Sequence, residues 1–562
     1  MTAGGAVFAR LKALGVRVVF ANSGTDFPPI IEGLAEAAAG DVALPDALVM
    51  PHEHVALGMA QGWYLATGET PAVMLHTNVG LANGAIGTIN AATDQVPMIL
   101  MSGRTPTTER GRFGSRTVPI GWGQEMRDQT ALVREACKWD YELRFPEQVG
   151  ELLDRAHAIA NSTPRGPVYL SLPRETLCEA CPTEGLDALP SMRPAQTGPR
   201  TADIAAAADI LTRASRPLIF AQRGAGSAAG FAALQRIADA FVIPVCHYWA
   251  VSLGLPTDHP MCVGADPEPW LSEADAVLVI DSLAPWSPQL HGPRPGVPVI
   301  QLGPDPLYAR FPVRNFRADL AIACETAEGL AALAEAMAAV AADGDGARDM
   351  RHAAIAMRTQ EIRARTAAAA RPAPSGRMTK AFGGATLSQA IAGRRATVLS
   401  ELGCPLDSLT LRDHDSWRQE PHSGGLGWSL PCAMGLKLGD PDRLVVATMG
   451  DGSYMFANPT ACHQAMEAYG LPVLAVVLNN GEWGAVRHSV AGLYPDGHAV
   501  RANRMPLTAL TPSPDFTKTA EASRAWARRV EQPEALAPAL DAAIEAVTAQ
   551  RRPALLDVAI AG

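Results

Sequence analysis

The stretch LVVATMGDG at residues 444–452, followed by VLAVVLNN at residues 473–480, decides the fold of this chain. Each stretch is an apolar run of strand length that ends in polar residues, Asp451 in the first and Asn480 in the second. Such runs are typical of strands buried in a parallel sheet. Because the carboxyl ends of parallel strands meet at one edge, where open α/β sheets bind ligands, we expect Asp451 and Asn480 to converge.

This pair of motifs has the chemistry of a site for a metal-bound diphosphate. One carboxylate and one amide oxygen, together with backbone carbonyls and a phosphate, make the hard-oxygen environment that Mg²⁺ prefers. Gly450 and Gly452 allow the backbone to approach a diphosphate closely. A GDG tripeptide alone is common in turns. Its combination with Asn479-Asn480 after a second buried strand favours the ligand site over two ordinary tight turns.

Composition indicates a large globular protein. The 562 residues suffice for three or four domains of about 150 residues each, and 48% hydrophobic with 19% charged residues is an ordinary soluble balance. The net charge of −10 gives no reason to expect nucleic acid or an anionic membrane as a partner. No apolar run is long enough to span a membrane, and the N-terminus begins with a helical pattern rather than a signal peptide. The nine cysteines are scattered, and we expect a cytoplasmic protein.

Strand-like and helical patterns alternate along the whole chain, which predicts three doubly wound parallel-sheet α/β domains. Two segments rich in proline or glycine, residues 181–200 and 371–378, are the expected linkers. The predicted domains are residues 1–185, 195–345 and 375–562. The first and third domains look like distant copies, because apolar strands after proline-containing turns recur at corresponding places: residues 95–103 with 471–479, and 165–173 with 552–560.

The middle domain has its own predicted strands at residues 217–221, 276–280 and 297–302. Gly224-Ala225-Gly226 follows the first of them. This is a lone G-x-G, which lacks the rest of a dinucleotide-binding fingerprint. We therefore favour a structural Rossmann-like domain over one that carries a nucleotide such as FAD.

The segment PHEHVALGMAQGWY at residues 51–64 places Glu53 at the start of a helix whose other positions are mostly small or apolar. In isolation Glu53 is an ordinary acidic residue stabilised by the helix dipole. The segment resembles the catalytic-glutamate helix of the thiamine-diphosphate (ThDP)-dependent decarboxylase and acetohydroxyacid synthase superfamily, and the GDG and NN motifs resemble that superfamily's diphosphate anchor. The resemblance covers the whole chain, in the order pyrimidine-binding domain, middle domain, diphosphate-binding domain.

The resemblance implies ThDP and Mg²⁺ as cofactors. It also implies that Glu53 bonds the aminopyrimidine ring, where burial favours the neutral carboxyl. In this superfamily the active site is shared between two subunits, so Glu53 of one copy would reach the cofactor held by another. We therefore expect a homodimer or homotetramer.

Further roles follow from the same resemblance. The carbonyl of Gly424 would face the 4′-amino group, and Leu426 would sit under the ring and bend the cofactor so that its reacting groups approach each other. Asp451, Asn480 and the backbone carbonyl of Glu482 would hold the metal. Other cofactor contacts are expected from Gly450, Gly452 and Ser453 at the diphosphate, and from Gly403 and Cys404 near its terminal phosphate.

The stretch LHTNVGLAN at residues 75–83 resembles benzoylformate decarboxylases, whose Leu-His-Ser segment supplies a catalytic histidine. An imidazole at His76 can move protons as the substrate reacts, although a core histidine at a strand end is the alternative. Acetolactate synthases usually carry Thr-Ser-Gly-Pro-Gly-like residues here. Thr25 matches a serine that bonds the substrate carboxylate, and His291 roughly matches the region of a second active-site histidine.

The sequence also departs from benzoylformate decarboxylases. Ser489 stands where a bulky aromatic residue is expected, and Trp286 and Trp428 add bulk if they face the pocket. We therefore predict a non-oxidative decarboxylase of a 2-oxo acid with an aromatic or extended side chain. One alternative is a carboligase of the acetolactate synthase or 2-hydroxyacyl lyase type, which uses an aldehyde or a second 2-oxo acid. The other is a paralogue that binds the cofactor without catalysis.

Overall fold

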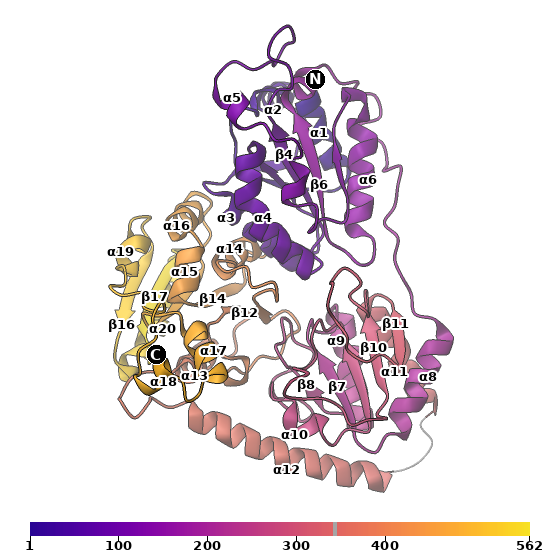
Figure 1. The fold of residues 1–562 in the computed structure, drawn as a ribbon, viewed down its shortest axis with the longest axis vertical. Helices are drawn as coiled ribbons and strands as arrows, with labels where there is room; N and C mark the ends of the chain where they lie inside the picture. The colour runs from indigo at the N-terminus through magenta and orange to yellow at the C-terminus, as the bar shows by residue number, and fades with distance from the viewer. Residues whose placement is uncertain (341–344, 562) are drawn as a thin grey trace.

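The computed structural model describes residues 1–340 and 345–561 and contains three parallel α/β domains (Figure 1). Within these residues the strands form three sheets of six, five and six strands, and every strand pair is parallel. The predicted fold class is therefore confirmed. Residues 341–344, in the second predicted domain, and residue 562, at the end of the third, lie outside the described residues. The domain boundaries themselves remain our proposal.

The N-terminal sheet has the order β2-β1-β3-β4-β6-β5. Alternate residues of its strands face opposite sides, because Val18 and Phe20 belong to one hydrophobic core and Val19 to another. The strands are β1 Val18–Ala21, β2 Asp46–Val49, β3 Ala72–Leu75, β4 Met98–Arg104, β5 Asp140–Glu142 and β6 Pro167–Pro173. The helices are α1 Ala3–Ala13, α2 Pro28–Ala39, α3 Glu53–Thr67, α4 Thr77–Thr93, α5 Ile120–Gly123, α6 Val149–Asn161 and α7 Arg174–Cys178.

The C-terminal sheet repeats this order strand for strand, as β13-β12-β14-β15-β17-β16. The first and third domains thus share one topology, as the sequence predicted. The strands are β12 Ala396–Glu401, β13 Trp417–Gln419, β14 Leu444–Gly450, β15 Leu474–Asn479, β16 Trp526–Val530 and β17 Ala554–Ala559. The helices are α13 Lys380–Ala390, α14 Ser429–Gly439, α15 Asp451–Phe456, α16 Pro459–Ala468, α17 Gly484–Leu493, α18 His498–Arg501, α19 Phe516–Glu521 and α20 Leu536–Thr548.

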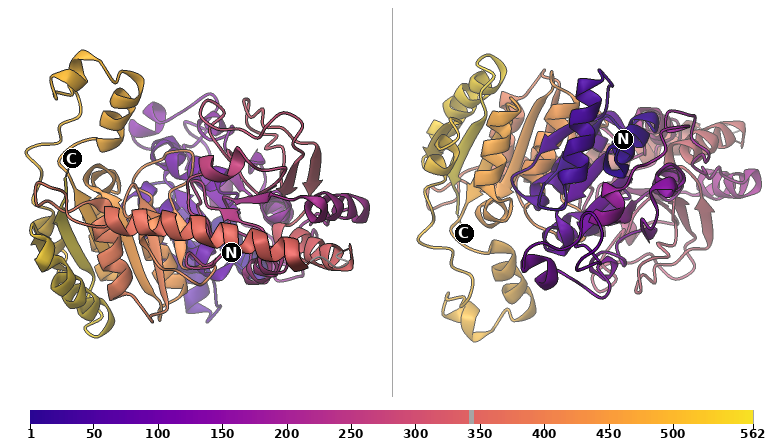
Figure 2. Two further views of the ribbon diagram at one scale, coloured as in Figure 1. Left: turned by 90° about the horizontal axis from the view of Figure 1, so that it is seen from below. Right: turned by 90° about the horizontal axis from the view of Figure 1, so that it is seen from above.

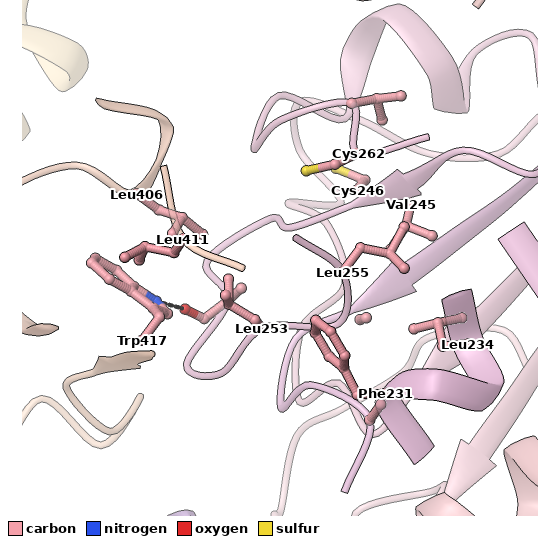
Figure 3. Packing of buried hydrophobic residues seen from close by; sticks show 14 of the residues in the cluster. Phe231, Leu234, Val245, Cys246, Leu253, Leu255, Cys262, Leu406, Leu411 and Trp417 are labelled. Carbon is pink, nitrogen blue, oxygen red and sulfur yellow. Dashed lines mark hydrogen bonds between the residues drawn. The ribbon is translucent and has the colours of Figure 1, made fainter. Parts of the chain in front are cut away.

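The middle domain has a five-stranded sheet in the order β11-β10-β9-β7-β8. Its strands are β7 Pro217–Ala221, β8 Val245–Cys246, β9 Ala276–Ile280, β10 Val299–Gly303 and β11 Leu320–Ala323, and its helices are α8 Thr201–Arg213, α9 Ala228–Phe241, α10 Glu268–Leu271 and α11 Thr326–Val340. Figure 3 shows Leu253 of this domain facing Leu411 and Trp417 of the C-terminal domain. The Trp417 indole Nε1 donates a hydrogen bond to the Ala250 carbonyl at 2.8 Å, so this interface has a fixed register.

The predicted linkers are irregular over most of their length, and the long helix α12 (Asp345–Ala369) runs beneath the middle and C-terminal domains (Figure 2). Arg10 holds the first linker in place. Its guanidinium forms a buried ion pair with Asp154 at 2.6 Å and also donates hydrogen bonds to the Leu186 and Ala188 carbonyls of the linker.

Among the described residues, no helix combines the length and the apolar character needed to cross a membrane.

Helices α3 and α14 join the first and third domains at very close range. A Cβ atom added at Gly62 would lie 1.9 Å from the Cys432 carbonyl oxygen, and one added at Gly435 would lie 1.9 Å from the Met59 carbonyl oxygen. Real Cβ atoms do not approach backbone oxygens this closely, so only glycine permits the contact. The packing places the N-terminus of α3, where Glu53 lies, in the same region as the N-terminus of α14.

We predict that Gly62→Ala destabilises the protein, because the new methyl group forces α3 and α14 apart. Overpacking of a core costs about 1–3 kcal/mol, so the thermal unfolding midpoint should fall by several degrees in differential scanning calorimetry. Gly150→Ala in α6 is the matched control, since a Cβ there meets nothing within 4 Å and should be neutral or stabilising. Equal midpoints for Gly62→Ala and the wild type would contradict the assigned packing.

Candidate functional site

The carboxyl edge of the C-terminal sheet brings Asp451 and the turn after β15 into contact. Asp451 is the first residue of α15, directly after β14. Its Oδ2 accepts a hydrogen bond from the Gly481 backbone N–H at 3.1 Å. Burial raises the pKa of Asp451 above its usual value. A carboxylate that is desolvated in this way gains from a cation beside it.

The two asparagines of the NN motif have different surroundings. Asn479 is buried, and its amide donates to Asp557 Oδ1 at 3.0 Å, which ties it into the sheet. Asn480 is partly exposed, and its Oδ1 accepts from the Glu482 N–H at 3.2 Å. The Glu482 side chain pairs with Arg487 at 2.7 Å, and its carbonyl accepts from the Gly484 N–H at 2.9 Å. Asn480 rather than Asn479 is therefore available to a ligand.

This donor set fits the metal that the sequence predicts. Asp451 supplies a carboxylate, Asn480 an amide oxygen, and Glu482 a carbonyl with one free lone pair, all hard oxygen donors of the kind that Mg²⁺ prefers. In the described part of the chain no cluster of three or more His, Cys, Asp or Glu residues is placed to hold a metal. The predicted set contains a single carboxylate and is a different kind of site.

The glycines of this edge are used in two ways. A Cβ atom at Gly450 would meet only Ser453 Oγ, at 4.0 Å, and one at Gly424 would meet nothing within 4 Å, so both leave room for a ligand. At Gly452 a Cβ would instead lie 2.1 Å from the Trp483 ring. Gly452 is thus needed for the packing of Trp483, a reason that differs from the predicted approach of a diphosphate.

The loop after β12 lies at the same edge. A Cβ at Gly403 would lie 2.4 Å from Thr448 Oγ1, and the Cys404 N–H donates to this oxygen at 3.2 Å. Lys380 at the start of α13 donates from Nζ to the Leu402 carbonyl at 2.5 Å. The loop is therefore held by β14 on one side and by the half-buried Lys380 on the other. Sequence reasoning found Gly403 and Cys404 but missed Lys380, which lies more than twenty residues earlier.

A buried carboxylate shapes the Gly424–Gly427 segment. Gly424 and Gly427 have φ of 70° and 86°, a backbone region that favours glycine. Glu401 accepts hydrogen bonds from the Gly427 and Ser429 N–H groups at 2.5 and 2.7 Å, and burial raises its pKa. Ser453, predicted at the diphosphate, is buried beside Glu401. Between these points Leu426 lines a 440 Å³ cavity together with His52, His54, Ala82, Asn83, Ile86, Met455, Phe456, Asn458 and Trp483.

Glu53 lies at the N-terminus of α3, as predicted. His52 is the N-cap of the helix, and its Nδ1 accepts from the His54 N–H at 3.1 Å. The Asn83 amide of α4 donates to Glu53 Oε2 at 3.2 Å, and the Glu53 side chain is only 12% exposed. His54 is buried and contacts the Gly427 carbonyl through Nε2 at 3.0 Å, so it links α3 to the Gly424–Gly427 segment.

His76 follows β3 at the N-terminus of α4 and forms a short pair with Asp26. The distance between His76 Nδ1 and Asp26 Oδ1 is 2.5 Å, and Gln124 Nε2 lies 3.2 Å from His76 Nε2. The hydrogen bond that His76 donates to Asp26 raises the pKa of His76. The second carboxylate oxygen of Asp26 is buried without a partner, as is the Thr77 hydroxyl. These unpaired groups beside an imidazole are typical of a site that awaits a polar ligand.

Sequence reasoning missed Asp26 and Gln124. Asp26 directly follows Thr25 after the first strand, and an acidic residue there was a signal that could have been used. Gln124 lies on an irregular segment far along the chain and gave no signal. Thr25, Asp26, Thr77 and Gln124 line one small cavity, so the structure brings Thr25 to the vicinity of His76.

His291 lies elsewhere, in the middle domain. Its ring packs edge-on against Tyr248 with 6.0 Å between centroids, and its Nδ1 is buried without a partner. No hydrogen bond or ion pair joins it to His76 in the residues that the structure describes. Its predicted role at the active site stays a prediction.

The two tryptophans considered as pocket bulk do not face a pocket. Trp286 packs against Phe220 and Phe316 in the middle-domain core, with ring centroids 5.5 and 5.4 Å away. Trp428 is 2% exposed and belongs to the core shared by the first and third domains. Both side chains therefore fill hydrophobic cores. Trp483, which the sequence did not single out by size, lines the Leu426 cavity instead.

The Gly224–Gly226 loop borders a 620 Å³ cavity between the three domains. Two ion pairs lie in it, Arg223 with Asp281 at 3.0 Å and Arg165 with Glu325 at 3.0 Å. A Cβ on Gly226 would lie 3.0 Å from the Thr326 side chain, so this glycine serves the packing of α11. The wall of the cavity thus contains charged side chains that pair with one another. Our preference against FAD stays a prediction.

Comparison with known proteins gives matches along most of the chain. Residues 1–132 match the model for the N-terminal TPP binding domain of thiamine pyrophosphate enzymes, residues 204–333 the central domain, and residues 406–558 the C-terminal TPP binding domain. Thiamine pyrophosphate is another name for ThDP. The three matched segments follow one another along the chain, and each falls in one of the three domains that contain a sheet.

Relatives with curated names include both decarboxylases and synthases. The chain is 27% identical to a probable 2-ketoarginine decarboxylase of Pseudomonas aeruginosa, over 95% of this chain and 90% of the relative. It is 25% identical to benzoylformate decarboxylase of the same species, over 85% of each. It is 23% identical to a probable acetolactate synthase large subunit of Methanocaldococcus jannaschii, over 99% and 91%.

A solved structure shares the fold over its whole length. The ThDP-dependent 4-hydroxybenzoylformate decarboxylase of Rhodococcus jostii RHA1 superposes with a TM-score of 0.80 and 22% identity, covering 100% of this chain and 99% of that one. At 22% identity, this similarity concerns the fold alone.

We predict that Asp26→Asn lowers the pKa of His76, because the amide cannot hold the imidazolium by charge. A histidine whose pKa is raised on folding adds stability fully below pH about 6.5, and this stability is lost as pH rises through the folded pKa. The variant should therefore lose about 1–3 kcal/mol near pH 6 and less near pH 9. Histidine NMR titration and thermal unfolding across this range measure both effects.

Asp46→Asn, at an exposed position on β2, is the control and should change neither the titration nor the pH dependence of unfolding. An unchanged His76 midpoint in Asp26→Asn would show that the pair does not set the protonation of the imidazole.

Proposed function

Because the chain belongs to the thiamine-diphosphate-dependent enzyme family, we propose that it is a ThDP- and Mg²⁺-dependent lyase that converts a 2-oxo acid into CO₂ and an aldehyde. The observation that carries this proposal is the His76–Asp26 pair, together with the half-buried Glu53, whose charge acts on the same imidazole. A lyase must deliver a proton to the carbon that loses CO₂, and an imidazole of raised pKa is suited to that task.

The C-terminal domain residues would hold the cofactors. Asp451, Asn480 and the Glu482 carbonyl would bind Mg²⁺, and the open backbone at Gly450 would admit the diphosphate. Leu426 and the Gly424 carbonyl would contact the aminopyrimidine end. ThDP, when bound, supplies a carbon nucleophile for the keto group and accepts the electron pair that CO₂ leaves behind.

The N-terminal domain residues would handle protons and the substrate. Glu53 would hold a proton against the aminopyrimidine ring, in a position fixed by Asn83. The Thr25 hydroxyl would bond the substrate carboxylate. When the bond between C1 and C2 breaks, a proton must replace CO₂ at C2, and we assign its delivery to His76. His291 would contact the same substrate from the middle domain.

We also propose that two copies of the chain complete each site, in a homodimer or homotetramer. Apolar side chains on the surface of α4 support this, since Val79 and Ile89 are each 48% exposed. Large exposed apolar residues continue nearby at Ile120 and Trp122, which are 61% and 45% exposed. Grouped apolar exposure is unusual on a free surface and typical of an interface.

The relatives leave the substrate and the reaction outcome open, because their names specify 2-ketoarginine, benzoylformate or acetolactate synthesis. A carboligase would use the same residues but join a second carbonyl compound before protonation. Incubation of the cofactor-loaded protein with a panel of 2-oxo acids, with and without an aldehyde, separates the two outcomes. We expect CO₂ and free aldehyde; a ligated hydroxyketone as the main product would favour the carboligase.

We predict that Glu53→Gln lowers turnover by about 10²- to 10⁴-fold, because glutamine keeps the shape of the side chain but cannot hold a transferable proton. CO₂ release under saturating cofactor measures this, and calorimetry should show that the variant still binds ThDP. Glu151→Gln at an exposed position of α6 is the control. Full activity in Glu53→Gln would remove Glu53 from the mechanism.

We predict that Asp451→Asn weakens Mg²⁺-dependent binding of ThDP by at least about ten-fold, the loss typical even of residues that only support metal ligands. Titration calorimetry with and without Mg²⁺ gives the affinity. In the wild type, cofactor with metal should raise the unfolding midpoint, and a chelator should reverse the gain. Asp541→Asn on the exposed side of α20 should behave as wild type, and unimpaired binding by Asp451→Asn would refute the metal assignment.

A further inference from the structure

A further cavity, of 280 Å³, lies at the carboxyl edge of β12 and β13, between the C-terminal and middle domains. It contains the loop that we assign to the terminal phosphate, with Gly403 and Cys404, and it extends to the middle-domain segment with Tyr248 and Trp249. The charged or titratable side chains that line it are Lys380, Asp407, Glu420 and His247. Only Lys380 among them brings a positive charge, since burial lowers the pKa of His247 to about 4.

Glu420 is the unusual member of this lining. The residue is 9% exposed, and its backbone N–H is fixed to the Ser400 carbonyl at 3.0 Å. Its carboxylate oxygen Oε2 is buried and has no hydrogen-bond partner. Burial, together with the nearby charge of Glu401, raises the pKa of Glu420 to about 8. The backbone N–H groups of Glu420 and Leu402 and the charge of Lys380 favour the carboxylate, but they do not offset the cost of its burial.

The charge of Lys380 acts on the Glu420 carboxyl group, but no direct ion pair in the described residues compensates it. In the described residues, no Lys, Arg or His side-chain nitrogen forms an ion pair with its carboxylate within 4.0 Å. Lys380 shares the cavity, but its Nζ donates to the Leu402 carbonyl at 2.5 Å. Asp407 adds a second carboxyl to the same wall. The acidic groups therefore outnumber the basic ones, and the cavity has an unfilled place for a positive charge.

The position of Glu420 connects this cavity to the proposed active site. Glu420 precedes Gly424 by four residues, and a chain of that length spans at most about 14 Å. The Trp417 indole, shown in Figure 3 with its hydrogen bond to the middle domain, fixes the strand that ends just before Glu420. The Gly424 N–H donates to the Pro421 carbonyl at 3.0 Å, so this segment turns and holds Glu420 closer to the aminopyrimidine segment than that limit.

The geometry points to Glu420 as the residue that selects 2-oxo acids whose side chain ends in a guanidinium or ammonium group. This inference rests on the proposed function, because it names the substrate class of that site. A guanidinium would give Oε2 the charge-assisted hydrogen bond that it lacks. A phenyl or neutral side chain would leave the carboxyl buried and unpaired, which is the more costly arrangement.

The test compares kcat/KM for 5-guanidino-2-oxopentanoate with that for 5-ureido-2-oxopentanoate, which has nearly the same shape but no charge. Phenylglyoxylate serves as the aromatic member. We expect the wild type, loaded with ThDP and Mg²⁺, to prefer the guanidino compound over the ureido compound by at least about ten-fold. In Glu420→Gln this ratio should fall to about one. Glu335→Gln, exposed on α11, should keep the wild-type ratio.

A wild-type ratio near one, a preference for phenylglyoxylate, or an unchanged ratio in Glu420→Gln would each overturn the inference. The wild-type ratio decides the matter even if the variant does not fold. Failure of the proposed function looks different, because then no 2-oxo acid releases CO₂. In that case calorimetry measures the affinities for 5-guanidinopentanoate and 5-ureidopentanoate. We expect the guanidino compound to bind about ten-fold more tightly. Equal affinities would contradict the assignment.

Discussion

The contact between α3 and α14 is the constraint on which the other features of the site depend. Each helix begins at a functional segment, α3 at Glu53 and α14 directly after the Gly424–Gly427 segment. The helices approach so closely that Gly62 and Gly435 cannot be replaced without moving backbone. Because the two helix axes are fixed, the first turns of both are fixed as well, and the His54 contact with the Gly427 carbonyl joins them directly.

The first and third domains share one sheet topology, so the two halves of the site occupy corresponding positions. The chemistry of the two halves differs. In both sheets the functional residues follow central strands at the carboxyl edge: His76 after β3 in the first, and Asp451 and Asn480 after β14 and β15 in the third. The first domain places an imidazole and carboxyl groups there, suited to proton transfer. The third places oxygen donors and open glycines, suited to a metal-bound diphosphate.

Buried carboxyl groups recur through the site, and their partners distinguish their tasks. Asp26 pairs with an imidazole, Glu401 accepts two backbone N–H groups, and Asp451 faces the turn after β15. Glu401 and Asp451 are compensated by the backbone N–H groups from which they accept hydrogen bonds, so each has a structural or positioning task even without ligands. Asp26 Oδ2 and Glu420 Oε2 both lack a hydrogen-bond partner, but Asp26 pairs with His76 through its other oxygen, whereas Glu420 forms no ion pair in the described residues. In a protein interior an uncompensated acid is costly, and its retention at a cavity wall is most simply explained by a ligand that compensates it.

The sequence by itself determined the parallel α/β class, the central strands β7, β9, β14 and β15 to within a residue, the helix that begins at Glu53, and the strand-end placement of Asp451 and Asn480. These follow from local patterns, because buried strands are continuous apolar runs and ligand residues follow them directly. Only the tertiary structure decided the pairing of His76 with Asp26, the burial of Trp286 and Trp428 in cores, the use of Gly452 to seat Trp483, and the unpaired Glu420. Each of these depends on which side chains meet across distant elements, and the free energy of a buried polar group is set by those neighbours rather than by its own place in the sequence.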